Sequence, residues 1–244
     1  MELKIYKDHN ELSAAAADII FDCVKNKPEA LLCFATGDSP KLAYQLFVEK
    51  AIEESLDLTG CFFIGLDEWV GISPDNTGSC HWYLHEYIFR PLNIDSSQFH
   101  LFNALAKNEE EECRKMNKLI STNGIDLAVV GVGMNGHIGF NEPGTDIHSL
   151  AHVAELDEIT RTVGQKYFEN EVTITKGITV GLKQLLEAET LLMLANGKKK
   201  APVIKKVVEE NISVNFPATL IRQHKNGFLI IDNEAASELT TEEK

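Results

Sequence analysis

Five short, mostly apolar runs recur along the chain, and polar breaks separate them from stretches in which apolar residues have helical spacing. The runs are ALLCFA (30–35), CFFIGL (61–66), IDLAVV (125–130), TLLMLA (190–195) and FLII (228–231). Nearly continuous apolar runs of this length are typical of strands that are buried on both faces of a sheet. The alternation predicts an α/β fold: a single domain over residues 1–244, doubly wound and Rossmann-like, with a mostly parallel sheet and helices on both faces.

Helix signals stand between these runs. Asp8 and Glu11 have capping-box spacing ahead of a predicted helix. Its apolar stripe comprises Leu12, Ala16, Ile19, Ile20 and Cys23. A second amphipathic helix is expected to begin near Lys41, and another to end at about Glu210.

Polar side chains follow the predicted strands directly. They occupy Thr36–Pro40, Asp67–Glu68, Gly131–Glu142 and Lys198–Lys200. In open α/β sheets, ligands bind beyond the carboxyl ends of the strands. We therefore expect these four loops to converge on one crevice.

The loop after the third run contains GVGMNG (131–136), which matches the G-x-G-x-x-G pattern of dinucleotide-binding proteins. That fingerprint requires a helix to start within the glycines, so that its amides meet a pyrophosphate. Here Gly139, Pro143 and Gly144 prevent a long regular helix. The glycines instead favour a turn in which the backbone passes close to a small ligand.

Four residues in these loops are candidates for acid–base chemistry. His137 and Glu142 could form an oriented proton-transfer pair, and the alternative is a structural histidine beside a surface acid. Asp67 and Glu68 end an apolar strand and should point in opposite directions, so that only one faces the crevice. A carboxylate buried there could act as a general base with a raised pKa, and the alternative is a helix cap or turn.

Two loops are candidates for binding an anion. Thr36, Gly37, Asp38 and Ser39 lie between a strand and a helix N-terminus, where hydroxyls and amides can hold a phosphate, although Asp38 would oppose one. The alternative is an ordinary N-cap. Lys198–Lys200 lie at a helix start, where a bound anion would offset the unfavourable dipole, and we expect two of these lysines to be solvated.

Composition narrows the function classes. The net charge of −14 argues against nucleic-acid binding. No run reaches the length of a membrane span and the first residues lack a signal-peptide pattern, so we expect a cytoplasmic protein. His81 and His85 are four residues apart but lack a third nearby ligand, and no C-x-x-C pair occurs, so we expect no metal site. The cysteines are Cys23, Cys33, Cys61, Cys80 and Cys113.

Six segments together resemble the glucosamine-6-phosphate deaminase family over nearly the whole chain. They are TGDSP, GLDEWVG, GVGMNGHIGFNEP, TRTV, GITVGL and NGKKKA. The resemblance implies a fold of the sugar-phosphate isomerase type and a reaction without metal or organic cofactor. The related 6-phosphogluconolactonases share a G-x-x-G-H loop but usually lack the N-E-P continuation. GMNGHIGFNEPG, GITVGLK and FPATLIRQH are most similar to the galactosamine-6-phosphate isomerase branch.

The resemblance also implies roles for single residues. Asp67 matches the base that moves a proton between C2 and C1, and His137 matches the residue that opens the pyranose ring. Glu142 matches the carboxylate that orients this histidine. Asn135 stands where an aspartate is common, and we expect its amide to hydrogen-bond the imidazole without adding charge.

Further matches concern the phosphate. Lys200 matches a phosphate-binding lysine, and Thr36–Ser39 match a loop around the same group. Lys166 stands at the position of a phosphate-binding arginine in a lid segment, with Arg161 nearby. Gly136, within the glycine loop, is expected beside the substrate.

We therefore expect an enzyme that isomerises and deaminates a 2-amino-2-deoxyhexose 6-phosphate, preferring galactosamine 6-phosphate, which gives tagatose 6-phosphate and ammonia. The alternative substrate is glucosamine 6-phosphate, which gives fructose 6-phosphate. Less favoured alternatives are a 6-phosphogluconolactonase and a non-catalytic sugar-phosphate sensor. The expected partner is a small-molecule sugar phosphate, not a nucleic acid or a membrane, and the resemblance also allows a homo-oligomer.

Overall fold

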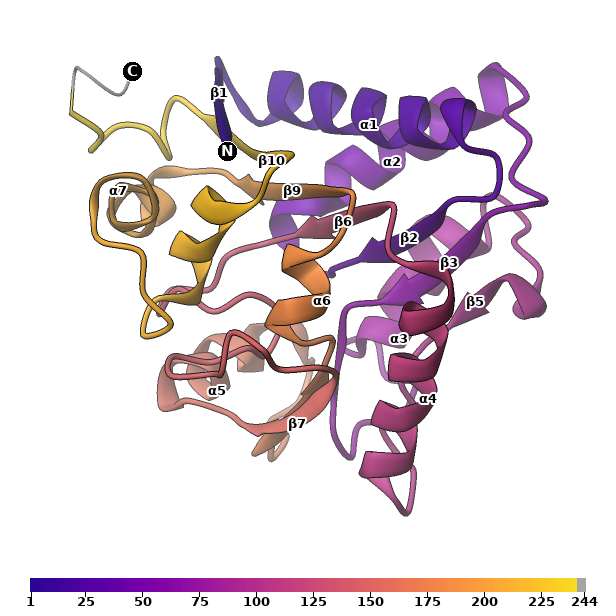
Figure 1. The fold of residues 1–244 in the computed structure, drawn as a ribbon. Coiled ribbons are helices and arrows are strands. Elements are labelled where there is room, and N and C mark those ends of the chain that lie inside the picture. Colours follow the sequence, from indigo (N-terminus) through magenta and orange to yellow (C-terminus); the bar gives the residue numbers. More distant parts are fainter. Residues whose placement is uncertain (241–244) are drawn as a thin grey trace.

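The computed structural model describes residues 1–240 and is built around a seven-stranded parallel sheet (Figure 1). In spatial order its strands are β1 (Glu2–Tyr6), β10 (Gly227–Asp232), β9 (Thr190–Ala195), β6 (Leu127–Val130), β2 (Leu31–Phe34), β3 (Phe62–Gly65) and β5 (Phe99–His100). Every neighbouring pair is parallel. All five predicted runs are strands of this sheet, so the α/β prediction is confirmed.

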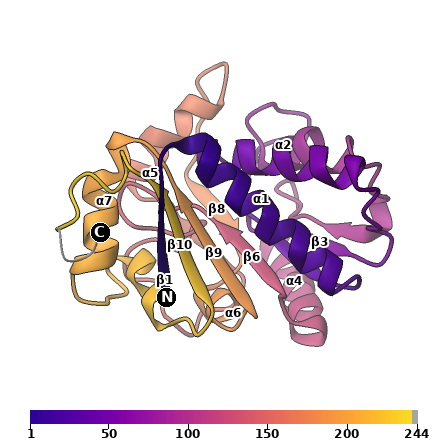
Figure 2. The ribbon, with the colours of Figure 1, turned by 90° about the horizontal axis from the view of Figure 1, so that it is seen from above.

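Helices cover both faces of the sheet, as predicted (Figures 1 and 2). One face carries α1 (His9–Asn26) and α2 (Asp38–Glu53), and the other carries α4 (Glu109–Asn123), α6 (Leu182–Leu186) and α7 (Ala201–Glu209). Alternate residues of β2 point to the two layers. Leu32 and Phe34 pack with α1 and α2, whereas Leu31 and Cys33 pack with the opposite layer. This double burial explains why the strands are continuously apolar.

Helix α1 begins as predicted, with one difference in its cap. Asp8 is the N-cap, and its carboxylate accepts hydrogen bonds from the amides of Asn10 and Glu11. The Glu11 carboxylate accepts a hydrogen bond from the backbone amide of Lys7 (3.2 Å) and not from that of Asp8, so the capping box is incomplete.

Helix α2 begins at Asp38, three residues before the predicted start. Gly37 precedes it with a φ of 123°, a conformation that L side chains rarely adopt, and this allows the chain to turn sharply from β2 into the helix. Neither Asp38 nor Ser39 caps the helix, and the Ser39 hydroxyl instead donates to Asn196 Oδ1 (2.6 Å). The N-cap alternative for this loop is therefore wrong.

A small antiparallel sheet was not predicted. It consists of β4 (Asp67–Trp69), β8 (Lys176–Thr179) and β7 (His152–Glu155), and it lies with α5 (Glu158–Gly164) beyond one end of the central sheet (Figure 1). The ring of Phe140 packs on this sheet, 4.6 Å from that of Trp69. An added Cβ at Gly177 would lie 2.2 Å from Phe140, so only glycine fits there.

The remaining elements are short. They are α3 (Cys80–Leu84), a π-helical turn η1 (His85–Phe89), and the 3-10 turns η2 (Ser96–Gln98), η3 (Gln165–Tyr167), η4 (Lys198–Lys200) and η5 (Pro217–Gln223). Within residues 1–240, no helix is both long and apolar enough to cross a bilayer. Over the same range, no three His, Cys, Asp or Glu side chains gather as metal ligands, and all five cysteines are free.

Candidate active site

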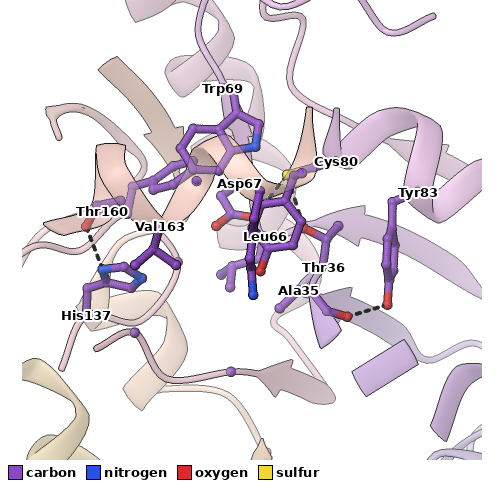
Figure 3. A pocket seen from close by; sticks show the side chains of 18 of the residues that line it. Ala35, Thr36, Leu66, Asp67, Trp69, Cys80, Tyr83, His137, Thr160 and Val163 are labelled. Atoms are coloured by element: carbon purple, nitrogen blue, oxygen red, sulfur yellow. Dashed lines mark hydrogen bonds between the residues drawn. The ribbon is translucent and has the colours of Figure 1, made fainter. Parts of the chain in front are cut away.

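One cavity lies where the strand order reverses, at the carboxyl ends of β2 and β6 (Figure 3). From β2 the chain continues to β3 and β5 on one side, and it then returns to build β6, β9 and β10 on the other. Such a switch point leaves a crevice between diverging loops. The loops after β2, β3, β6 and β9 all line the cavity, as predicted. Helix α3, helix α5 and η3 complete the walls.

Asp67 is the first residue of β4 and projects into the cavity (Figure 3). Its Oδ1 lies 3.7 Å from the thiol of Cys80. Burial raises the pKa of Asp67 to about 7, and the neighbouring Glu68 carboxylate contributes to the increase. A carboxyl with this pKa can both accept and donate a proton near neutral pH.

Glu68 points the other way, as the strand alternation predicted. It accepts hydrogen bonds from the backbone amides of Trp69 (2.9 Å), Cys80 (3.0 Å) and His81 (2.8 Å). Burial raises the pKa of Glu68, and these amides oppose the increase. Glu68 thus fixes the start of α3 against β4 and leaves Asp67 as the carboxylate that faces the cavity.

His137 is held by two groups on one edge of its ring. Its Nδ1 lies 3.0 Å from the Thr160 hydroxyl and 3.5 Å from Oε2 of Glu142. Burial would raise the pKa of Glu142, but hydrogen bonds that include those from His137 and Thr160 outweigh it, and the pKa is below its ordinary value. A Cβ at Gly133 would lie 2.2 Å from Nε2 of the ring, so the glycine loop is needed for the imidazole to fit.

Asn135 does not hydrogen-bond the imidazole, contrary to our expectation. Its Nδ2 donates to Oε2 of Glu142 (2.8 Å), and its Oδ1 accepts from the backbone amide of His137 (3.2 Å). Gly136, with a φ of 83°, makes a tight turn that brings this amide to the Asn135 side chain. Asn135 therefore fixes the carboxylate that supports the ring.

Cations gather at another wall of the cavity. Lys200 lines it, and burial together with the nearby Lys166 ammonium lowers the pKa of Lys200 to about 8. Lys166 also lines the cavity and forms an ion pair with Asp38 (2.6 Å). Thr36 and Gly37 lie on the same wall. These groups could hold a phosphate.

Several predicted binding residues lie outside the cavity lining. Arg161 is exposed, because α5 turns by about 100° per residue and directs Thr160 and Val163, rather than Arg161, to the cavity. Gly136 packs against the ring of Phe216. Ser39 is bonded to Asn196, and Asp38 meets the cavity only through Lys166. Lys198 and Lys199 are exposed, as expected for two of the three lysines.

Much of the cavity wall consists of residues that were not predicted from the sequence. The missed residues include Trp69, Cys80, Tyr83, Thr160 and Tyr167. The Tyr83 hydroxyl donates to the Gly37 carbonyl (2.8 Å) and so braces the loop after β2. Cys80 and Tyr83 share one helical face, a spacing that could have identified them. His81 and His85, at nearby positions in the chain, do not line the cavity; their rings stack on each other with centres 4.7 Å apart.

Comparison with known proteins gives consistent matches. The family model described as glucosamine-6-phosphate isomerases/6-phosphogluconolactonase matches residues 7–230. A glucosamine-6-phosphate deaminase of Thermoanaerobacter sp. (strain X514) is 36% identical, over 100% of this chain and 97% of the relative. Glucosamine-6-phosphate deaminase 1 of Bacillus subtilis (strain 168) is 37% identical, over 97% and 98%.

Solved structures agree with these matches. The structure of a monomeric glucosamine-6-phosphate deaminase superposes with a TM-score of 0.94 at 36% identity and covers 98% of this chain and 100% of that one. A 6-phosphogluconolactonase from Trypanosoma brucei gives a TM-score of 0.80 at 16% identity, with 98% of both chains covered. At that identity the second match bears on the fold alone.

Proposed function

The chain belongs to the glucosamine-6-phosphate isomerase/6-phosphogluconolactonase family, and from this premise we propose that it converts glucosamine 6-phosphate and water into fructose 6-phosphate and ammonia. The protein is an amino-sugar-phosphate isomerase/deaminase, and the identity of the sugar is what we propose. The observation that carries the proposal is the shared cavity, in which Asp67 and His137 stand together with Lys166 and Lys200.

The proposal replaces the expected preference for galactosamine 6-phosphate. That expectation came from three short segments, whereas the relatives that match the whole chain at 36–37% identity are named glucosamine-6-phosphate deaminases. The two sugars differ only in the orientation of the hydroxyl at C4. One of these segments carries His137 and Glu142, which serve proton transfer near C1, and the other two lie outside the cavity lining. The three segments therefore carry little information about C4.

Ring opening is the first step. The His137 imidazole takes the proton of the C1 hydroxyl and delivers a proton to the oxygen of the sugar ring, which gives an open-chain aldehyde. Glu142 and Thr160 hold Nδ1 and leave Nε2 on the opposite edge of the ring. The Glu142 carboxylate, beside Nδ1, keeps the imidazole in this orientation during the transfer.

Asp67 then moves one proton. The aldehyde at C1 acidifies the hydrogen on C2. The ionised carboxylate removes this hydrogen while the C1 oxygen takes up a proton from the ammonium group at C2, which gives a neutral enolamine. The same carboxyl returns a proton to C1, which leaves a hydroxymethyl group there and an imine at C2. Water adds to the protonated imine, and the nitrogen leaves as ammonium when the carbonyl at C2 forms. Contacts to the phosphate, remote from C1 and C2, hold the sugar in register.

Turnover of two sugars tests the proposal. The purified protein should release ammonia and ketose 6-phosphate from glucosamine 6-phosphate, with kcat/KM about tenfold or more above that for galactosamine 6-phosphate, because a site that hydrogen-bonds a hydroxyl discriminates against its misplacement. Asp67→Asn, purified in parallel, controls for a contaminating deaminase. Faster turnover of galactosamine 6-phosphate would reverse the substrate choice. Failure of both sugars, with hydrolysis of 6-phosphogluconolactone instead, would overturn the proposal.

The pH dependence should follow the Asp67 carboxyl. Since only the ionised form accepts the C2 proton, kcat should fall about tenfold per unit below pH 7. Burial places the pKa of Asp67 in the folded protein above its ordinary value of 3.8. The contribution of this carboxyl to the stability of the fold is therefore fully present below pH 3.8 and is lost as the pH rises through about 7. An asparagine does not titrate, so Asp67→Asn is not destabilised as the pH rises. The Tm of this variant relative to that of the native protein should therefore increase from pH 5 to pH 8. Rate profiles and thermal melts check both, and an acid limb near pH 4 would contradict the account.

A further inference from the structure

An ion pair links the start of α2 to η3, one of the elements that line the cavity. The Lys166 ammonium, in η3, lies 2.6 Å from the Asp38 carboxylate and 4.7 Å from the centre of the Tyr167 ring. The Tyr167 hydroxyl approaches Gly37 so closely that an added Cβ would lie 3.5 Å from it. Element η3 therefore contacts the loop after β2. Asp38 is paired with Lys166, one of the two lysines that line the cavity.

The position of Asp38 is one that favours an anion. It is the first residue of a 16-residue helix, where the macrodipole stabilises negative charge, and no side chain among residues 1–240 caps that helix. Its carboxylate also opposes the decrease in the pKa of Lys200 that burial and Lys166 cause. Asp38 thus lies within electrostatic reach of both lysines and of the helix start, which are the groups that a phosphate would use.

We propose that the Asp38 carboxylate competes with the substrate phosphate for Lys166 and is not itself a phosphate ligand. An ionised carboxylate has no proton to donate, so it can only repel a phosphate dianion. While the pair with Asp38 is closed, the Lys166 ammonium is shared with that carboxylate, so its full charge and all three of its N–H groups are available to the phosphate only when the pair opens. The inference rests on the proposed function of the cavity, and it reassigns a residue that the sequence analysis placed among the phosphate-binding ones.

The pair is accessible, which limits the size of the effect. The Asp38 side chain is 74% exposed and that of Lys166 is 48% exposed. Exposed pairs contribute modestly, so removing the competitor should tighten phosphate binding by about three- to fivefold. The exchange also allows the phosphate to leave readily after the reaction, because the carboxylate can return to Lys166.

Asp38→Asn in the full chain tests this. The dissociation constant of inorganic phosphate, measured by titration calorimetry, should decrease about three- to fivefold, and KM for glucosamine 6-phosphate should decrease in parallel while kcat changes less than twofold. Asp38→Ser, an independent variant with a good helix-start residue, should give the same result. With Lys166→Met in the background, Asp38→Asn should change phosphate binding much less.

Glu110→Gln is the matched control. Glu110 lies in the first turn of α4, pairs with Arg114 (4.0 Å), and is absent from the cavity lining. It changes the net charge equally and should leave phosphate binding unchanged. An equal effect of this control, or unchanged or weaker phosphate binding in both Asp38 variants, would overturn the inference. Because calorimetry needs no turnover, a failure of the proposed reaction would be seen separately.

Discussion

Asp67→Asn is expected to lower kcat for glucosamine 6-phosphate by about 10³-fold, within the range that general acid–base catalysis contributes. The amide fills nearly the same volume but cannot accept the C2 proton. In the proposed function, Lys166 and Lys200, which line another wall of the cavity, hold the phosphate, so the dissociation constant of the substrate should change less than about threefold. Stopped assays of ammonia and calorimetric titration of the inactive variant measure the two quantities.

Asp75→Asn is a suitable control for this substitution. Asp75 is exposed and does not line the cavity, so the same acid-to-amide change should leave kcat within about twofold of the native value. A comparable loss of binding and turnover in Asp67→Asn would mean that Asp67 holds the substrate. Near-native kcat would remove it from the mechanism.

His137→Gln is expected to lower kcat by about 10²-fold or more, because the ring oxygen then lacks its proton donor. The defect should be specific to the cyclic substrate. Fructose 6-phosphate exists in solution partly as an open chain, and added ammonium regenerates the imine at C2. Exchange of the C1 hydrogen with D₂O under these conditions requires Asp67 but no ring opening by His137. His137→Gln should therefore retain much of this exchange, whereas Asp67→Asn should lose it.

Proton exchange followed by NMR separates the two roles. His148→Gln, a substitution at an exposed histidine outside the cavity lining, should leave both turnover and exchange unchanged. If His137→Gln lost exchange as completely as turnover, the assignment of His137 to ring opening would be wrong. Thermal melts of each variant establish that the fold is retained.

The central sheet could be predicted from the sequence because its strands are buried on two faces. Leu32 and Phe34 face one helix layer and Leu31 and Cys33 face the other, so the apolar run has no polar interruption. The small sheet lacks that signal. β7 runs from His152 to Glu155 with partly exposed side chains, and it forms only by pairing with a distant segment.

The same distinction applies to the cavity. Asp67, His137 and Lys200 follow apolar strands, so topology alone brings them to one end of the sheet. Thr160 and Tyr83 come from helices, and which side of a helix faces the cavity depends on tertiary packing; the spacing of Cys80 and Tyr83 shows that they share a face but not what that face meets. Arg161 was expected at the phosphate because it is near Lys166 in sequence, but it lies on a side of α5 that does not line the cavity.

A structure of Asp67→Asn with glucosamine 6-phosphate bound tests the central claim most directly. The account predicts that C1 and C2 lie against residue 67, that the ring oxygen lies within hydrogen-bond distance of His137, and that the phosphate lies on Lys200 and Lys166 with the Asp38 ion pair open. A sugar bound with its C1–C2 bond remote from residue 67, or with its phosphate at the His137 side of the cavity, would contradict it.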